Sequence, residues 1–583
     1  MKGKNYSSLS YSELLRIHSE QERDVLDTII NISVLSNITV NQLTEPLECK
    51  LGLSKISCNI TFGDYDNIVQ GSYRSKNQDV VIIFWESCNI FSNFHFEVEK
   101  LEEDEFVELL ERVKSEITLV LDNLSTTSLV IFNEFSSSIF DSQQPGNSNY
   151  VKFVNCLNQY LRESLVRNVV LIDLTRVFLR IGVEKCVDFR FYYLSRALYT
   201  FEFWKAYSAH IEPYILAKTG KSKKALIFDC DNTLWKGILG EDGFNNIDIS
   251  PESPEGSIFH EVQSIAVKLS QMGTIIGICS KNNITDVQEV MRNHPDHILK
   301  EEFIYISKCN WNDKVTNLTE IAKELNVSLE SIVFIDDSCF EVEFVRTSLP
   351  QVTVIQVPKN IYEYANLVRR HLYLFYKFSI TDEDKRKATI YKEQQIREKS
   401  KSNFKNIETY LSNLGLRVSA YLNQTSQTER IAQMTQKTNQ FNLRTKRYTE
   451  QEIENFIASE SFYVFTFSVS DRFGDSGISG LCMVKLEDEL AFFDTFLLSC
   501  RVIGRNVEFK ILNYVLTFLK SKGVRYVSAE YIPTNKNDQA ANFYDNCLFN
   551  LENKSVSCKE YKVDLCEWKS TDVEYIEIEG VEV

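Results

Sequence analysis

The sequence contains little of what marks fibrous, membrane-spanning or secreted chains. Its 583 residues include only 20 Gly and 9 Pro, which excludes a collagen-like or proline-rich architecture. No apolar run is long enough for a membrane-spanning helix, and the longest, such as VVIIFW at 80–85, have the length of a strand. The N-terminal segment lacks the apolar stretch of a secretory signal. We therefore expect a folded protein without a membrane span.

Positively charged residues are also fewer than negatively charged ones. The chain has 64 Lys and Arg against 81 Asp and Glu, which gives a net charge of −17. Nucleic acid is therefore not an expected partner, because neutralising its phosphates requires a basic surface. The 14 Cys are scattered without a CxxC pair or His-rich neighbours. In a chain without a secretory signal this favours reduced thiols over disulfides or zinc sites, and we expect a cytoplasmic protein.

The order of apolar and charged stretches divides the chain into several parts, as its length requires. Residues 1–218 alternate short apolar strands with amphipathic helices, which is typical of an α/β domain with a parallel sheet. Residues 222–375 repeat this pattern. The charged, glycine-free stretch 376–407 predicts a connecting helix, and residues 408–583 predict a third α/β domain with an acidic tail. The expected fold class is therefore multidomain α/β, with a Rossmann-like core.

The stretch KKALIFDCDNTLW is the most informative part of the central block. Asp229 follows four apolar residues, 225–228, and therefore lies at the carboxyl end of a buried parallel strand, where open α/β sheets bind ligands. Asp231 follows two positions later. Two carboxylates this close repel each other unless a cation lies between them or one is protonated. Mg²⁺ is the cation that hard oxygen ligands next to a phosphate prefer.

Further polar groups follow the next predicted strands. The strand in TIIGICSKNN ends at Ser280, and the Lys281 and two Asn that follow are suited to bind phosphoryl oxygens. Lys314 begins a predicted helix and supplies the positive charge that a phosphoryl group needs. The strand in SIVFIDDSCFE is followed by three carboxylates that would complete a metal site: Asp336, Asp337 and Glu341.

This order of motifs, DxDxT and then Ser, Lys and DD, resembles the haloacid-dehalogenase (HAD) phosphatase superfamily. The resemblance implies that Asp229 attacks phosphorus to form an aspartyl-phosphate and that Asp231 acts as general acid and then base. Ser280 and Lys314 would hold the phosphoryl group. The implied Mg²⁺ ligands are Asp229, Asp231 and Asp336 or Asp337.

The spacing of these motifs leaves no room for a large cap domain. Neither the interval from Asp229 to Ser280 nor that from Ser280 to Lys314 is long enough once its helices are counted. An open site of this kind suits a bulky or protein-tethered substrate, and another domain or a partner must then exclude water.

Three longer motifs, NTLWKGILGEDG, AQMTQKTNQFNLRTKRYTEQEI and LLSCRVIGRNVEFKIL, resemble the FkbH-like (HAD-IIIC) family over about residues 30–550. Its members join a HAD core to a C-terminal acyltransferase-like domain of the GNAT fold. The resemblance implies an enzyme that dephosphorylates a three-carbon substrate derived from 1,3-bisphosphoglycerate and loads the glyceryl group on an acyl carrier protein. Other members are known only as phosphatases of natural-product or surface-glycan pathways. A Mg²⁺-dependent phosphatase without acyl transfer and a non-catalytic scaffold therefore remain as alternatives.

The GNAT-like part has its own candidate site between a predicted strand and a predicted helix. Backbone N–H groups at such a helix start can bind the phosphates of CoA or of a carrier's phosphopantetheine. The family pattern has a small residue, usually Gly, where this chain has Asn, and the added bulk opposes close approach of a cofactor. The candidate cofactor-binding residues are Arg501, Gly504, Arg505 and Asn506.

Two thiols and one phenol are candidates for acyl transfer. Cys279 and Cys500 each lie beside a predicted phosphate site, where positive charge lowers a thiol pKa. Strand alternation could instead turn Cys279 into the core, and Cys230 is expected to be a packing residue. Tyr544 is expected either near a thioester sulfur or as a core aromatic.

The N-terminal block resembles the SGNH-hydrolase fold by the same family likeness. Ser36 follows its first predicted strand, where the nucleophile of an active member stands. No Asp-x-x-His occurs before Gly220, so the base that would activate this serine is missing. We therefore expect a degenerate domain for docking or structure.

Overall fold

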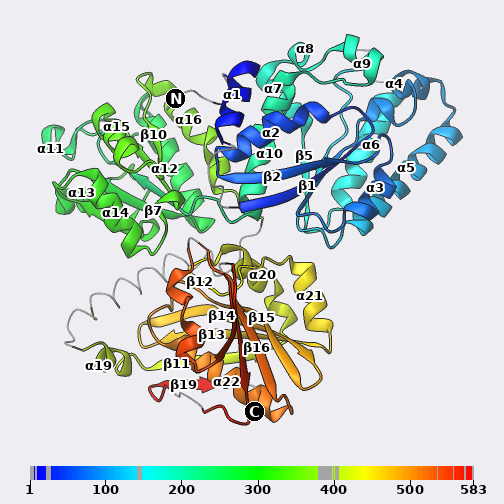
Figure 1. The fold of residues 1–583 in the computed structure, drawn as a ribbon. Helices are drawn as coiled ribbons and strands as arrows, with labels where there is room; N and C mark the ends of the chain where they lie inside the picture. Colours follow the sequence, from blue (N-terminus) through cyan, green and yellow to red (C-terminus); the bar gives the residue numbers. More distant parts are fainter. Residues whose placement is uncertain are drawn as a thin grey trace. The chain divides into compact units, whose positions relative to one another are not determined.

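The computed structural model describes residues 6, 9–21, 28–140, 148–378, 397, 400, 406–534, 536–555, 557–569 and 573–580. The chain separates into two compact units. Figure 1 shows its helices and strands, coloured along the sequence. One comprises Met1–Thr219 with Tyr448–Glu452, and the other comprises Gly220–Arg447 with Ile453–Val583. The connecting helix predicted over 376–407 lies almost entirely outside the described residues.

The N-terminal sheet has five parallel strands in the order β2-β1-β3-β4-β5. Its strands are β1 (Thr28–Ser36), β2 (Ile56–Phe62), β3 (Val80–Phe84), β4 (Val130–Asn133) and β5 (Val169–Ile172). The helices are α1 (Tyr11–Gln21), α2 (Thr44–Gly52), α3 (Ile68–Ser75), α4 (Phe94–Glu97), α5 (Glu103–Asn123), α6 (Asn149–Glu163), α7 (Leu174–Ile181), α8 (Val183–Cys186), α9 (Phe189–Ser195) and α10 (Phe201–Lys218). Alternate residues of β3 enter two separate cores, one shared with α2, α7 and α10 and the other with α5 and α6. Helices therefore cover both faces, as a fully parallel sheet requires.

The central sheet is also parallel, in the order β10-β9-β6-β7-β8. Its strands are β6 (Ala225–Phe228), β7 (Ile275–Ser280), β8 (Ile306–Cys309), β9 (Ile332–Asp336) and β10 (Thr353–Gln356). The helices are α11 (Leu239–Asp242), α12 (Gly256–Gln271), α13 (Ile284–Asn293), α14 (Lys314–Glu324), α15 (Cys339–Ser348) and α16 (Tyr364–Arg370). The chain leaves β6 toward β7 and β8 and returns on the other side to β9 and β10. This reversal places the topological switch point, where open α/β sheets bind ligands, at the carboxyl end of β6.

The C-terminal sheet has nine strands and is mostly antiparallel, with the order β17-β18-β16-β15-β14-β13-β11-β19 and β12 beside β15. Its strands are β11 (Leu416–Leu422), β12 (Phe441–Asn442), β13 (Phe462–Asp471), β14 (Gly474–Glu487), β15 (Leu490–Leu498), β16 (Tyr526–Tyr531), β17 (Asn550–Lys554), β18 (Lys559–Asp564) and β19 (Ile576–Glu579). The helices of this part are α19 (Ile407–Ser412), α20 (Thr428–Lys437), α21 (Glu450–Ala458), α22 (Val507–Ser521) and α23 (Phe543–Asn546). Helix α22 forms the crossover between the parallel strands β15 and β16.

The predicted fold class, a multidomain α/β protein with a Rossmann-like parallel-sheet core, is confirmed. Within the described part of the chain, every helix is too short or too polar to cross a membrane.

Candidate active site

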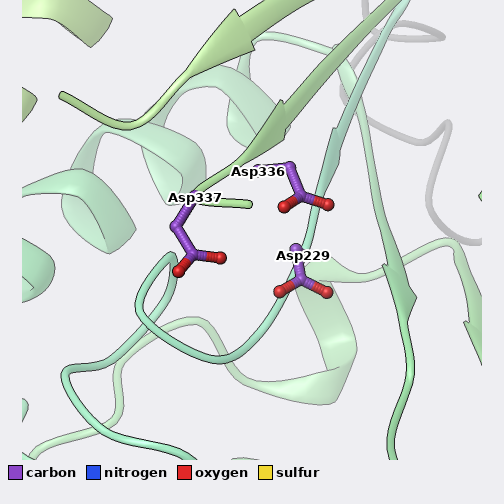
Figure 2. Close-up of side chains that lie close together, drawn as sticks. All are labelled: Asp229, Asp336 and Asp337. Carbon is purple, nitrogen blue, oxygen red and sulfur yellow. The ribbon is translucent and has the colours of Figure 1, made fainter. Parts of the chain in front are cut away.

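Three carboxylates meet at the carboxyl edge of the central sheet. Asp229 directly follows β6. Asp336 is the last residue of β9, and Asp337 comes directly after it. The two strands are parallel neighbours, with Phe228 opposite Ile335, so their carboxyl ends lie side by side. One oxygen from each of the three carboxylates lies within 4.8 Å of the others, and Figure 2 shows the side chains directed toward a common space.

The burial of these carboxylates makes a bound cation favourable. Asp229 is 7% exposed and Asp336 is 1% exposed. Burial and the charge of Asp229 raise the pKa of Asp336 to about 7, and the same two causes raise the pKa of Asp337. Oδ2 of Asp336 accepts no hydrogen bond from the described residues. A buried set of oxygen ligands with an unsatisfied oxygen fits a hard cation such as Mg²⁺.

Lys314 is the positive charge next to this cluster. It begins α14, whose N-cap Asp313 accepts a hydrogen bond from the backbone N–H of Thr316. The Lys314 ammonium donates to Oδ1 of Asp229, and its Nζ lies 3.4 Å from Oδ2 of Asp336. Although burial by itself lowers the pKa of Lys314, the two carboxylates raise it above the ordinary value. The structure thus places Lys314 at the site as a permanent cation.

Ser280 and Asn282 lie at the end of the neighbouring strand β7. Burial raises the pKa of Asp229, and Lys314 together with a hydrogen bond from Ser280 offsets this rise only in part. The amide of Asn282 donates to Oγ of Ser280 at 3.2 Å and to Oδ2 of Asp231 at 2.9 Å. One asparagine thus fixes the positions of two predicted catalytic groups.

Asp231 is held apart from the three-carboxylate cluster. Its Oδ1 accepts hydrogen bonds from Nε1 of Trp235 and from the backbone N–H of Leu239, both at 3.0 Å, and its Oδ2 accepts the bond from Asn282. Three of the four predicted metal ligands are therefore brought together, and the fourth carboxylate is bound elsewhere. The sequence-based assignment of roles missed Trp235, whose signal was its place one helical turn after Asp231.

Glu341 does not join the cluster as expected from its position after β9. Its Oε1 lies 2.6 Å from Nζ of Lys281, the residue that follows Ser280. This ion pair links α15 to the loop after β7 at the edge of the site.

Cys279 is placed where a reactive thiol is disfavoured. The side chain is fully buried in the central core, and burial raises the pKa of its thiol to about 12. An acyl-accepting cysteine needs the opposite environment, which lowers the pKa. The structure therefore supports the packing alternative for Cys279, and Cys230 is likewise buried with a raised thiol pKa.

Alkylation of the native protein will discriminate between these environments. We expect iodoacetamide to modify the exposed Cys339 and Cys566 and to spare Cys279 until the protein is denatured. Peptide mass spectrometry of native and urea-treated samples measures the extent of labelling. Labelling of Cys279 as fast as that of Cys339 in the native protein would contradict the placement.

The C-terminal candidates are mostly engaged by the protein itself. The buried guanidinium of Arg505 donates to Oδ2 of Asp471 at 3.1 Å and to the carbonyl of Arg501 at 2.6 Å. Gly504 and Asn506 both have left-handed φ values, +80° and +62°, and the Asn506 amide donates to the Tyr575 hydroxyl at 2.7 Å. Asparagine thus adopts here a conformation for which glycine is the usual residue.

The two remaining acyl-transfer candidates lie in different surroundings. Tyr544 is 2% exposed and packs against Phe543, Phe549 and Tyr561, which is the position of a core aromatic. Cys500 is partly exposed.

Ser36 lies at the carboxyl end of β1 but is occupied by the backbone. Its hydroxyl donates to the carbonyl of Phe84 at 2.8 Å and accepts from the N–H of Ile38 at 3.1 Å. No histidine of the described residues is bonded to it. The geometry agrees with the expectation of an unactivated serine.

We expect Ser36→Ala to lower the free energy of unfolding by about 1 kcal/mol, because two hydrogen bonds are lost. Hydrolysis of p-nitrophenyl acetate should not change. Ser33→Ala on the same strand, which removes a hydrogen bond to Ser75, is the matched control. A drop in ester hydrolysis in Ser36→Ala but not in the control would show that the serine is active.

Comparison with known proteins identifies likenesses in solved structures only. No protein-family model and no curated protein matches the sequence. The N-terminal part of the protein BF1531 from Bacteroides fragilis, which contains a phosphatase domain complexed with Mg, is 24% identical. The match covers 63% of this chain and 99% of that chain with a TM-score of 0.54.

Two acetyltransferases also match parts of the chain. PaiA N-acetyltransferase from Thermoplasma acidophilum, complexed with coenzyme A, is 16% identical over 20% of this chain and 72% of that chain, with a TM-score of 0.18. The ribosomal-protein-S18-alanine N-acetyltransferase from Escherichia coli is 11% identical over 27% of this chain and 99% of that chain, with a TM-score of 0.21. The likeness to the Bacteroides protein shows that the matched 63% of this chain shares the fold of that phosphatase-containing structure.

Proposed function

We propose that this protein is a Mg²⁺-dependent phosphatase of the HAD type, with Asp229 as its nucleophile. The observation that carries the proposal is the meeting of Asp229, Asp336 and Asp337 beside Lys314 at the topological switch point of a parallel sheet. The fold shared with a structure that contains a Mg-bound phosphatase domain supports it.

Each residue of the site has its own role in the proposed reaction. A carboxylate oxygen of Asp229 attacks phosphorus, the bond from phosphorus to the leaving oxygen breaks, and Asp231 donates a proton to that oxygen. Asp231 then takes a proton from the water that hydrolyses the aspartyl-phosphate. Ser280 and Lys314 hold the phosphoryl oxygens. When bound by Asp229, Asp336 and Asp337, Mg²⁺ would neutralise charge on the transferred group.

The finer proposal is glyceryl transfer to an acyl carrier protein. The carrier thiol would displace phosphate from the carboxyl carbon of a 1,3-bisphosphoglycerate-derived substrate, and Asp229 would remove the second phosphate. The open form of the site supports this, since β6 and β7 are joined by only α11 and α12, and β7 and β8 by only α13 and one 3₁₀ turn, Glu301–Phe303. A site without a cap can admit a substrate tethered to a protein.

A plain phosphatase of glycan or natural-product biosynthesis is the second candidate. It is favoured by the C-terminal loop, where Arg505 and Asn506 are bound to other residues of the protein. A non-catalytic scaffold is the third, and the buried carboxylate cluster, in which Oδ2 of Asp336 accepts no hydrogen bond from the described residues, counts against it.

One experiment separates these functions. Purified protein is incubated with Mg²⁺ or EDTA, a panel of phosphorylated three-carbon acids that includes 1,3-bisphosphoglycerate, and candidate carrier proteins. We expect Mg²⁺-dependent phosphate release and a glyceryl adduct on a carrier by intact mass spectrometry. Phosphate release without an adduct supports the plain phosphatase, and no release from a broad panel by well-folded protein contradicts both enzymatic functions.

A further inference from the structure

Strands β15 and β16 of the C-terminal sheet separate along their length. They pair in parallel only where Leu490–Phe492 lies opposite Tyr526–Ser528. Both then continue, to Leu498 and Tyr531, without pairing to each other. We call the space between residues 493–498 and 529–532 the β15–β16 gap.

The gap lies where an extended cofactor arm would run from the predicted phosphate loop. Residues 501–506 follow the carboxyl end of β15, at the open end of the gap. Facing strand edges present unpaired N–H and C=O groups, and an extended chain of amides binds such an edge as an added strand. A phosphopantetheine arm with its phosphate on this loop would therefore pair its amides with β15.

That edge is already paired with the chain itself. Phe441 and Asn442, which form β12, lie antiparallel to Leu498 and Leu497. The N–H of Leu443 donates to the carbonyl of Phe496 at 3.2 Å. On the other side, the carbonyl of Leu443 accepts from the N–H of Ile532 at 2.8 Å. One short segment thus bonds to the backbone of β15 on one side and to Ile532, the residue that follows β16, on the other.

The segment is buried and packed like a part of the core. Phe441, Asn442 and Leu443 are 5%, 1% and 0% exposed. The Phe441 ring packs edge-on against Phe543 with 5.3 Å between ring centroids. The amide of Asn537 donates to the carbonyl of Asn442 at 2.9 Å. The chain's own side chains therefore occupy this place as part of the packed interior.

Ion pairs join the residues that come after Leu443 to both strands. Nη1 of Arg444 lies 3.1 Å from Oδ1 of Asp494 on β15, and Nε of Arg444 lies 2.9 Å from Oε2 of Glu530 on β16. Lys446 adds a bond to Asp494 at 2.7 Å. Asp494 stands at a bulge in the β14–β15 ladder, where its backbone has no partner in β14, and its carbonyl accepts from Nη1 of Arg444 at 3.2 Å. Arg444 thereby joins the two strands.

The phosphate end of the predicted site is also unfavourable for an anion. Glu508 lies in the first turn of α22, and its buried Oε2 accepts no hydrogen bond from the described residues. A phosphate at this helix start would meet the carboxylate next to the N–H groups that should bind it. Arg505, one of the predicted phosphate ligands, is paired with Asp471.

We infer that residues 441–446 of this chain permanently fill the β15–β16 gap, so that the C-terminal domain takes no phosphopantetheine arm there, whether from CoA or from a carrier protein. This inference does not depend on the proposed phosphatase activity. It assigns any acyl transfer by this protein to the open site of the central sheet rather than to the acyltransferase-like domain.

Hydrogen–deuterium exchange of the full-length protein tests the inference. We expect slow exchange at Leu443 and Ile532, and the same rates with CoA or acetyl-CoA at about 1 mM, a concentration that saturates a site of micromolar Kd. Equilibrium dialysis with labelled CoA should show no saturable binding. Stoichiometric binding, or faster exchange at Leu443 when CoA is added, would overturn the inference.

A variant tests whether the segment is held as described. Arg444→Met should increase exchange at residues 441–443 about tenfold or more, because the segment loses its ion pair with Glu530 and one of its two ion pairs with Asp494. Lys485→Met, which breaks the exposed pair with Glu487 on β14, is the matched control and should leave these rates unchanged. Rapid exchange at 441–443 in the unaltered protein would contradict the filled gap, whatever the result for phosphate release.

Discussion

Asp229→Asn will abolish phosphate release while leaving the protein folded. The amide cannot form the acyl-phosphate bond, and loss of a covalent nucleophile lowers kcat by a factor on the order of 10⁴ or more. Folding should not suffer, because Lys314 keeps Asp336 as a partner and the repulsion between Asp229 and Asp336, which raises the pKa of Asp336, is removed. We therefore expect a melting temperature in EDTA no lower than that of the unaltered protein.

Two measurements make this result specific. Acid-quenched reactions with labelled substrate should yield a hydroxylamine-sensitive phosphoenzyme that is absent from Asp229→Asn. Asp286→Asn, the same chemical change at an exposed residue of α13, should retain phosphate release within about twofold. If Asp229→Asn keeps more than a tenth of the activity, Asp229 is not the nucleophile.

Lys314→Met will reduce both stability and activity. Its side chain is 3% exposed and pairs with Asp229 and Asp336, so its removal leaves two buried carboxylates without their cation. Breaking a buried ion pair in this way costs about 3–5 kcal/mol. Activity should fall by a factor on the order of 10² to 10³, as when a group that stabilises transition-state charge is removed. Urea denaturation in EDTA measures the first effect and phosphate release the second.

The stability loss in Lys314→Met should depend on pH and on Mg²⁺. Asp336 has a folded-state pKa of about 7, above the unfolded value of about 3.9, so the folded state binds the proton more tightly. The free energy of unfolding in EDTA therefore falls as the pH rises between about 4 and 7. For Lys314→Met it should be lowest near pH 7. Mg²⁺ should restore part of the loss by replacing the ammonium charge.

Lys308→Met supplies the comparison for this effect. Lys308 lies on β8 and pairs with Glu320 and Glu324, whose side chains are 46% and 47% exposed. Its removal should cost no more than about 1 kcal/mol, because such pairs are screened by water. Equal losses in the two variants would show that Lys314 is not a buried partner of the carboxylates.

Much of the central site could be predicted from local sequence. Asp229 and Asp336 each terminate a run of apolar residues, and such runs form the buried strands of a parallel sheet. Since all strands of this sheet point the same way, polar residues that follow them gather at one edge. Lys314 was found for the same reason, because it begins the helix that follows β8.

Local sequence could not assign the partners of these groups. Asp231 lies outside the cluster and accepts hydrogen bonds from Trp235, from Leu239 and from Asn282, which lies in the loop after β7. Cys279 could not be placed because every residue of β7 is buried, so the strand carries no alternation of apolar and polar residues.

The sequence by itself determined the α/β class of this protein and the residues of its central carboxylate site, because both follow from short patterns within single strands. Only the tertiary structure decided which of the candidate groups are already bonded to other parts of the protein. The filling of the β15–β16 gap depends on pairing Phe441 and Asn442 with Leu498 and Leu497, which are far apart in the chain. Contacts of this range arise from the packing of whole elements, and no local pattern specifies them.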